Sequence, residues 1–142
     1  MNHKRKNWNE YFMDIAELIA TRATCDRKHV GAVIVKGRRI LATGYNGSVS
    51  GGDHCTEVGH LMVDGHCLRT VHAEVNAIAH AAKHGIPIDG SAIYVTAQPC
   101  FKCFCVIANT GIRNVYYKES YGKFNEDMSK VINSTNIKIQ KI

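Results

Sequence analysis

The sequence predicts an α/β domain in which a mixed five-stranded sheet is flanked by helices. Segments with apolar residues at helical spacing alternate with short apolar segments typical of strands, in the order α-β-β-α-β-α-β-α-β. The strand–helix–strand units should cross over right-handed, which makes the later strands parallel. The 142 residues contain no repeat, low-complexity tract or Pro/Gly-rich linker, so we expect one domain over residues 1–142.

The first part of the chain supplies one helix and two strands. Residues 8–22 have large apolar side chains at helical spacing, which predicts an amphipathic helix. Residues 30–46, VGAVIVKGRRILATGYN, predict two strands joined by a tight turn at Lys36-Gly37. Residues 47–71 contain five glycines and little periodicity, so we expect a Cys/His-rich loop or insertion here. A loop of this length is usually functional or held in place by something.

The second part alternates helices with strands. A helix is expected from about His72 to Lys83, with Gly85 as its C-cap. The residues of this helix expected to face the core are Val75, Ile78, Ala79 and Ala82. The remaining elements are expected in this order: a strand at 91–96, a helix at 99–111 with Pro99 near its first turn, a strand at 112–118, a short helix at 125–134 and a strand at 136–142.

The composition favours a cytoplasmic protein that binds anions. The formal net charge is +6, which suits nucleotides, phosphorylated substrates or nucleic acid, although no long basic run selects among them. No apolar run reaches the length of roughly 18–20 residues that a membrane span requires. The basic N-terminal segment lacks the apolar stretch of a secretory signal. We therefore expect no membrane association.

A candidate metal site involves three residues. Cys100 and Cys103 form a C-x-x-C pair at a predicted helix N-terminus, where exposed N–H groups favour thiolates. A lone C-x-x-C could be a redox pair or part of a structural zinc site. His72, at the start of the preceding helix, offers a third ligand. Three protein ligands leave the fourth position of tetrahedral zinc open for water, as in catalytic sites.

Glu74 then acquires a chemical role. It lies two residues after His72, so it can sit beside the metal without binding it and can transfer protons. The combined pattern H-x-E…P-C-x-x-C is the signature of zinc-dependent nucleobase deaminases. The alternative is purely structural, with His72 as a helix N-cap and the two cysteines as small buried side chains.

Three stretches carry a resemblance to a known family: VGAVIVKGRRILATGYNG, CLRTVHAEVNAI and YVTAQPCFKC. Over nearly its whole length the chain resembles the cytidine/deoxycytidylate deaminase superfamily, and within it the dCMP deaminases. The resemblance implies a three-layer α/β/α fold, a catalytic zinc on His72, Cys100 and Cys103, and Glu74 as proton shuttle. Zinc-bound hydroxide would attack C4 of the cytosine ring. The products are dUMP, which supplies thymidylate synthesis, and ammonia.

The same resemblance suggests residues that bind substrate. Asn46 would hydrogen-bond the sugar, the backbone N–H of Ala73 would meet the pyrimidine carbonyl, and Tyr121 would lie against the base. Asn46 is also a plausible turn residue before Gly47, and Tyr121 could have a packing role instead. The basic residues before the first predicted strand could bind the phosphate or form a solvated turn: Arg22, Arg27 and Lys28.

A second zinc site is expected from the remaining cysteines and the insertion. The resemblance points to Cys25 and Cys55, and we complete a closed Cys₃His site with His60 and Cys67. Either of two other histidines, His54 or His66, could replace His60. The alternative is free cysteines in a polar loop.

The resemblance also implies a homo-oligomer, often a hexamer, activated by dCTP and inhibited by dTTP, with Gly44 and Lys83 as candidate regulatory residues. Two other functions remain open. A tRNA adenosine deaminase shares the metal motif, but the Cys/His-rich insertion argues against it and makes nucleic acid an unexpected partner. A zinc-stabilised nucleotide-binding module without catalysis would not need Glu74.

Overall fold

A computed structural model, which describes residues 3–142, contains the mixed five-stranded sheet that the sequence predicts. Its strands lie in the order β2-β1-β7-β8-β9. Strand β1 is antiparallel to β2 and β7, whereas β7, β8 and β9 run parallel. The strand bounds are β1 Gly31–Lys36, β2 Arg39–Tyr45, β7 Ala92–Ala97, β8 Asn114–Glu119 and β9 Lys138–Lys141.

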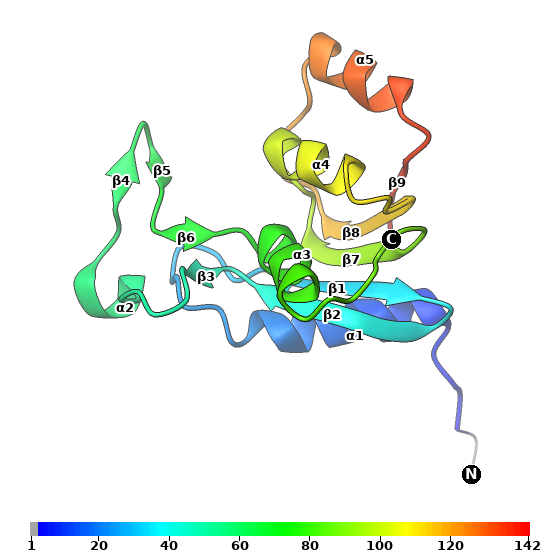
Figure 1. Cartoon of the computed structure of the whole chain (residues 1–142), viewed down its shortest axis with the longest axis horizontal. Coiled ribbons are helices and arrows are strands. Elements are labelled where there is room, and N and C mark those ends of the chain that lie inside the picture. Colours follow the sequence, from blue (N-terminus) through cyan, green and yellow to red (C-terminus); the bar gives the residue numbers. More distant parts are fainter. Residues whose placement is uncertain (1–2) are drawn as a thin grey trace.

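Helices cover both faces of the sheet (Figure 1). Along β1, Val33 and Val35 pack with Phe12 of helix α1, while Ala32 and Ile34 join the core that α3 and α4 cover. This alternation follows from the two-residue period of a strand whose two faces are both buried. The helix bounds are α1 Trp8–Ala20, α3 Ala73–Lys83, α4 Phe101–Ala108 and α5 Glu126–Ser134.

The core-facing side of α3 differs from the prediction. Its buried residues are Ala73, Glu74, Ala77 and Ala81. Ala79 and Ala82, expected in the core, are exposed. The helix packs very closely on β2: a Cβ added to Gly44 would lie 2.4 Å from the backbone oxygen of Ala73 and 2.4 Å from the nitrogen of Ala77. Small residues therefore form the contact surface of α3. The apolar periodicity did not correctly predict which face of this helix is buried.

Two turns also differ in detail from the expectation. The residues between β1 and β2 are Gly37 and Arg38, both with positive φ, so the turn lies one residue later than expected. This is the backbone twist that a two-residue hairpin requires. Pro99 precedes α4 rather than lying in its first turn, and Cys100 is the N-cap.

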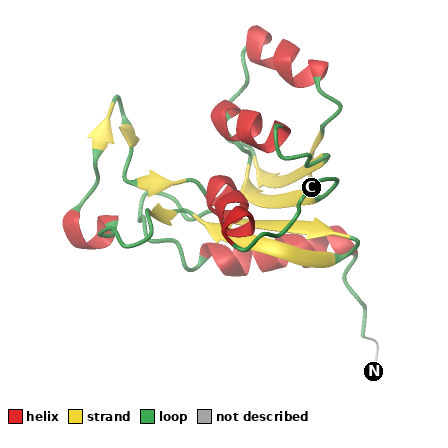
Figure 2. Cartoon of the chain, viewed as in Figure 1, coloured by secondary structure: helices red, strands yellow, loops and turns green. Residues whose placement is uncertain are grey.

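The insertion at residues 47–71 is a structured arm that extends from the body (Figures 1 and 2). Its base is a pair of two-residue strands, β3 Gly47–Ser48 and β6 Thr70–Val71. Its outer part contains helix α2, Cys55–Val58, and a hairpin of β4, Met62–Val63, with β5, His66–Cys67. Among residues 3–142, no helix has the length and apolar character needed to cross a membrane.

Candidate active site and metal clusters

The first candidate site lies where two helices begin. His72 is the N-cap of α3 and Cys100 is the N-cap of α4, and the Cys100 sulfur accepts a hydrogen bond from the backbone N–H of Cys103. Helix N-termini stabilise negative charge through their free N–H groups. The Cys103 and His72 side chains, both within hydrogen-bonding distance of the Cys100 sulfur, lower the pKa of Cys100 to about 4. This sulfur is therefore a ready thiolate ligand.

The spacing of these three ligand atoms fits one zinc ion. His72 Nδ1 lies 3.7 Å from the Cys100 sulfur and 3.3 Å from the Cys103 sulfur. A nitrogen and a sulfur on the same tetrahedral zinc are about 3.6 Å apart, given the usual Zn–N and Zn–S bond lengths. The chemistry of the donor set, one imidazole and two thiolates, also suits zinc and leaves one position for another ligand.

Glu74 lies beside this cluster in the first turn of α3. The residue is 4% exposed, and its Oε2 atom is buried without a hydrogen-bond partner in the described part of the chain. Burial raises the pKa of the Glu74 carboxyl, against opposing effects from Cys103 and His72. A buried carboxyl with a free oxygen next to a metal cluster is suited to exchange a proton with a ligand on that metal.

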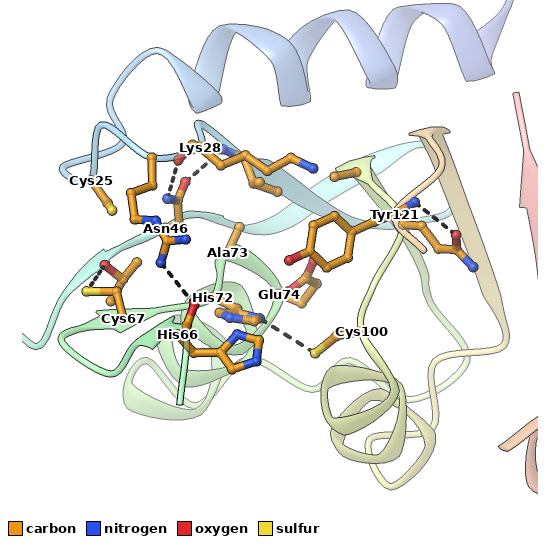
Figure 3. Close-up of a pocket in the computed structure, with 16 residues that line it drawn as sticks. Cys25, Lys28, Asn46, His66, Cys67, His72, Ala73, Glu74, Cys100 and Tyr121 are labelled. Carbon is orange, nitrogen blue, oxygen red and sulfur yellow. Dashed lines mark hydrogen bonds between the residues drawn. The ribbon is translucent and has the colours of Figure 1, made fainter. Parts of the chain in front are cut away.

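A cavity of about 390 Å³ is lined by Glu74 and by two of the three ligands, His72 and Cys100 (Figure 3). This volume lies within the range of small-molecule sites, roughly 300–1,000 Å³. Five of the six residues expected to bind substrate line the cavity: Arg27, Lys28, Asn46, Ala73 and Tyr121. Ala73 is the first residue of α3, so its backbone N–H has no acceptor within the helix.

Asn46 lines the cavity, and its side chain also forms two hydrogen bonds with the backbone. Its Oδ1 accepts a hydrogen bond of 2.7 Å from the Val30 N–H, and its Nδ2 donates one of 2.6 Å to the Lys28 carbonyl. The amide therefore holds the segment that leads into β1. The Lys28 ammonium lies 4.3 Å from the centre of the Tyr121 ring, an arrangement typical of a cation–π contact.

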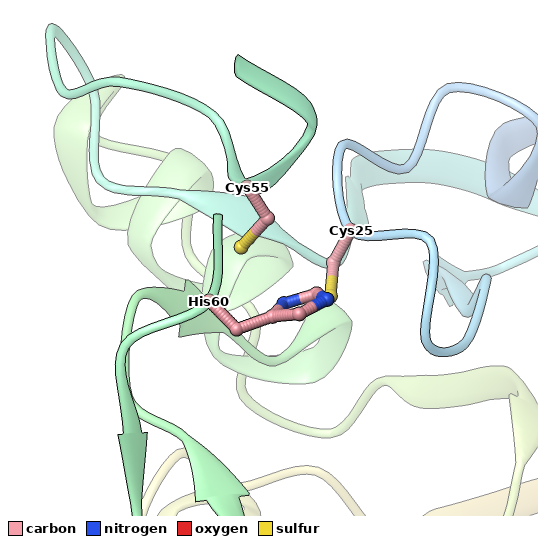
Figure 4. Close-up of side chains that lie close together, drawn as sticks. All are labelled: Cys25, Cys55 and His60. Atoms are coloured by element: carbon pink, nitrogen blue, oxygen red, sulfur yellow. The ribbon is translucent and has the colours of Figure 1, made fainter. Parts of the chain in front are cut away.

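A second cluster joins the arm to the body (Figure 4). The ligand atoms of Cys25, Cys55 and His60 lie within 4.8 Å of one another. The Cys67 sulfur is 3.7 Å from that of Cys55, and the Cys25 sulfur is 3.7 Å from His60 Nδ1. Both distances match the edges of a zinc tetrahedron, about 3.8 Å between sulfurs and about 3.6 Å between sulfur and nitrogen. The structure therefore groups three of the four residues expected for the second site, Cys25, Cys55 and His60, and places the fourth, Cys67, beside Cys55 at the edge of that group.

The Cys67 thiol shows the electrostatics of this cluster. Burial alone would raise its pKa, but hydrogen bonds from the His60 side chain and from the Leu61 and Arg69 backbones outweigh burial and lower the pKa to about 6. The other two candidate histidines lie elsewhere. His54 is the N-cap of α2, and His66 lines the cavity above Glu74.

Comparison with known proteins identifies the family. The family model described as "Cytidine and deoxycytidylate deaminase zinc-binding region" matches residues 6–119. The chain belongs to this deaminase family. The sequence-based resemblance and the expected fold are thereby confirmed.

Three similar proteins illustrate the relationship. ComE operon protein 2 of Bacillus subtilis is 52% identical over 118 residues, covering 83% of this chain and 62% of that protein. The deoxycytidylate deaminase of Mycobacterium phage D29 is 40% identical over 129 residues, covering 82% of this chain and 98% of its own length. A dCMP deaminase of cyanophage S-TIM5, solved in complex with dCMP and dUMP, has a TM-score of 0.81 at 34% identity, covering 99% of this chain and 100% of that one.

Some residues expected to be functional lie outside the deaminase cavity. Arg22 is exposed and is not among the residues that line the cavity, unlike Arg27 and Lys28. Gly44 is buried beneath α3, where its role is close packing. Lys83 is exposed at the end of α3 opposite to His72.

The sequence did not indicate that two further residues, His66 and Gln98, line the cavity. The sequence indicates His66 only as a possible metal ligand, whereas in the structure it lines the cavity beside Cys67 of the same short strand. Gln98, at the end of β7, accepts a hydrogen bond of 3.2 Å from the Tyr121 N–H and so holds the loop that carries Tyr121. No sequence motif indicated that contact.

We expect His72→Ala and Cys100→Ser each to lose one equivalent of zinc per chain, because two remaining ligands hold the ion weakly. Zinc is measured by mass spectrometry of the purified protein. Cys105→Ser is the matched control, since Cys105 lies on α4 with an exposed sulfur outside both clusters. Unchanged zinc content in both site variants would contradict the ligand assignment.

Proposed function

We propose that the protein is a zinc-dependent dCMP deaminase, which converts dCMP and water to dUMP and ammonia. The observation that carries the proposal is the buried Glu74, with its unpartnered oxygen, at one end of a cavity that has Arg27 and Lys28 in its lining. The similarity to deoxycytidylate deaminases over almost their full length supports this choice of substrate. The dUMP produced would supply thymidylate synthesis.

The residues have complementary roles in this reaction. His72, Cys100 and Cys103 would hold zinc, which when bound lowers the pKa of a coordinated water toward neutrality. Glu74 takes a proton from water and delivers it to the pyrimidine ring nitrogen; it then takes the proton of the hydroxyl now on C4 and delivers it to the departing amino group. The Ala73 N–H donates to the pyrimidine carbonyl, Asn46 contacts the sugar, and Tyr121 packs against the base.

The phosphate end of the substrate would lie against Arg27 and Lys28. His66, which lines the same cavity from the arm, can donate a hydrogen bond to the phosphate there. A dianionic phosphate is bound well by several charged donors arranged around it. This part of the cavity would make the protein select a nucleotide over a nucleoside, which has no phosphate.

The chain acts as one domain over residues 1–142, with a second, structural zinc on Cys25, Cys55, His60 and Cys67. With Cys67 as fourth donor beside the group of Cys25, Cys55 and His60, the second cluster would leave no position for substrate, in contrast to the first cluster. The buried Glu74 argues against a non-catalytic binding module, because an unpartnered buried carboxyl destabilises a fold that does not use it.

Exposed apolar residues on the arm support self-association. Six large apolar side chains there are at least 43% exposed: Val49, Val58, Leu61, Met62, Val63 and Leu68. Apolar clusters of this kind mark contact surfaces. The arm at residues 47–71 has three acidic side chains and one basic side chain, which gives it a formal net charge of −2. Since the whole chain has a net charge of +6, the remaining residues together carry +8. An acidic arm and a basic body are complementary between two copies of the chain.

Glu74→Gln should reduce dCMP turnover by a factor of at least ~10²–10⁴, because the amide cannot accept the proton. Zinc content and dUMP binding should stay close to wild type. Ammonia release is measured from dCMP and from a tRNA anticodon stem-loop, with the exposed Glu126→Gln as control. Activity of the wild type on the RNA alone would favour the adenosine deaminase, and unchanged turnover of the variant would remove Glu74 from the mechanism.

Lys28→Ala should raise the KM for dCMP about tenfold, since a charged hydrogen bond contributes ~1.5–3 kcal/mol. The KM for deoxycytidine, which has no phosphate, should not change. Arg22→Ala removes the same charge from a neighbouring exposed position outside the cavity and serves as control. An equal rise in KM for both substrates would show that Lys28 does not select for phosphate.

The protein should sediment as a homo-oligomer, a hexamer by family resemblance, well above the 15.7 kDa of one chain. Val63→Asp should shift it toward smaller species, because the change puts a charge on the apolar arm. Val131→Asp, at an equally exposed valine on α5, should not. We also expect dCTP to raise and dTTP to lower dCMP turnover by the assembled protein. A monomeric wild type would contradict the assembly.

A further inference from the structure

The second metal cluster borders the same cavity as the first. Cys25 and Cys67 line the cavity together with His72 and Glu74 (Figure 3). Cys25 also precedes Arg27 and Lys28 by two and three residues, and Cys67 directly follows His66. Each of the three residues assigned to the phosphate end is thus within three positions of a ligand of the second cluster. The two chain segments involved are otherwise distant in sequence.

Other contacts between these segments are weak. The Arg27 guanidinium reaches the Gly65 carbonyl and the Met62 sulfur of the hairpin, both at 3.5 Å. The hairpin strands β4 and β5 contain two residues each, and such a hairpin is not stable by itself in water. Within the described residues, Cys25 and Cys55 are the buried members of this junction. Bonds from a metal to the cluster residues would therefore be the strongest link between the two segments.

Asp26 adds a further contact at the junction. Its Oδ1 lies 3.0 Å from His60 Nε2, while His60 Nδ1 lies 3.7 Å from the Cys25 sulfur. A carboxylate that accepts the Nε2–H fixes the tautomer in which Nδ1 is free to bind metal. Asp26 stands between a ligand and Arg27 in the chain, so it connects the histidine of the arm to the cationic segment of the body.

We propose that the second cluster, closed by metal and oriented by Asp26, positions the phosphate-binding end of the cavity. In this proposal Arg27 and Lys28 from the body and His66 from the arm meet at the phosphate because the cluster joins the segments that carry them. Asp26 is a positioning residue that does not touch the substrate. The proposal rests on the proposed function, since it assigns the cationic end to the phosphate of a nucleoside monophosphate.

The test uses Cys67→Ser and Asp26→Asn in the full chain, with Cys105→Ser and the exposed Asp127→Asn as matched controls. Zinc per chain, dUMP binding by calorimetry, and kcat and KM for dCMP and deoxycytidine are measured. Cys67→Ser should lose one zinc and bind dUMP at least about tenfold more weakly. Its KM for dCMP should rise, whereas kcat at saturation and the KM for deoxycytidine stay near wild type.

Asp26→Asn retains all four ligands and changes an exposed side chain, so it keeps the proposal testable if Cys67→Ser does not fold. It should lose one zinc to a chelator more readily, by about 10–100-fold in metal affinity, with a parallel weakening of dUMP binding as that zinc leaves. Loss of the second zinc with unchanged dUMP affinity in either variant would overturn the proposal. A wild type that binds dUMP but does not deaminate dCMP would instead contradict the proposed function.

Discussion

The close approach of helix α3 to strand β2 is the constraint on which the site depends. Gly44 allows it, because any side chain there would overlap the helix backbone, and the fully buried Ala73 and Ala77 complete the contact. At this separation the start of α3 reaches the start of α4. His72 thereby meets Cys103 across the gap, and Glu74 lies in the interior instead of at the surface. A packing requirement between small residues thus determines the position of the chemistry.

Burial of Glu74 destabilises the folded chain and also raises the pKa of the carboxyl. An unpaired carboxyl oxygen in the interior destabilises the folded chain, and burial raises the carboxyl pKa because the charged form loses its hydration. The same shift brings the carboxyl closer to the pKa of a proton carrier that works near neutrality. The instability is acceptable because the sheet beneath has both faces covered by apolar side chains.

The sheet was predictable from sequence because its strands are long enough to show a period and both its faces are buried. The cluster of His72, Cys100 and Cys103 was predictable because the pattern H-x-E…P-C-x-x-C marks its residues, which lie at the starts of two helices. The buried face of α3 was not, since alanines carry almost no periodic signal. The arm was expected only as a loop or insertion, because its strands of two residues are too short to show alternation. Local sequence also does not distinguish His60 from His66. In the structure, His60 lies with Cys25 and Cys55 in the second cluster, whereas His66 lines the cavity.

The two clusters lie on parts of the fold that differ in rigidity. The first is built on the starts of two core helices, so its geometry is as rigid as the sheet that supports them. The second is built on an arm with little buried apolar surface, whose shape, in our proposal, depends on the metal ligands that join it to the body. On that proposal, changes in the arm would alter the part of the cavity near Arg27 and Lys28 while His72, Cys100 and Glu74 keep their positions. Substrate affinity would then vary independently of proton transfer, because the two proposed functions depend on different parts of the fold.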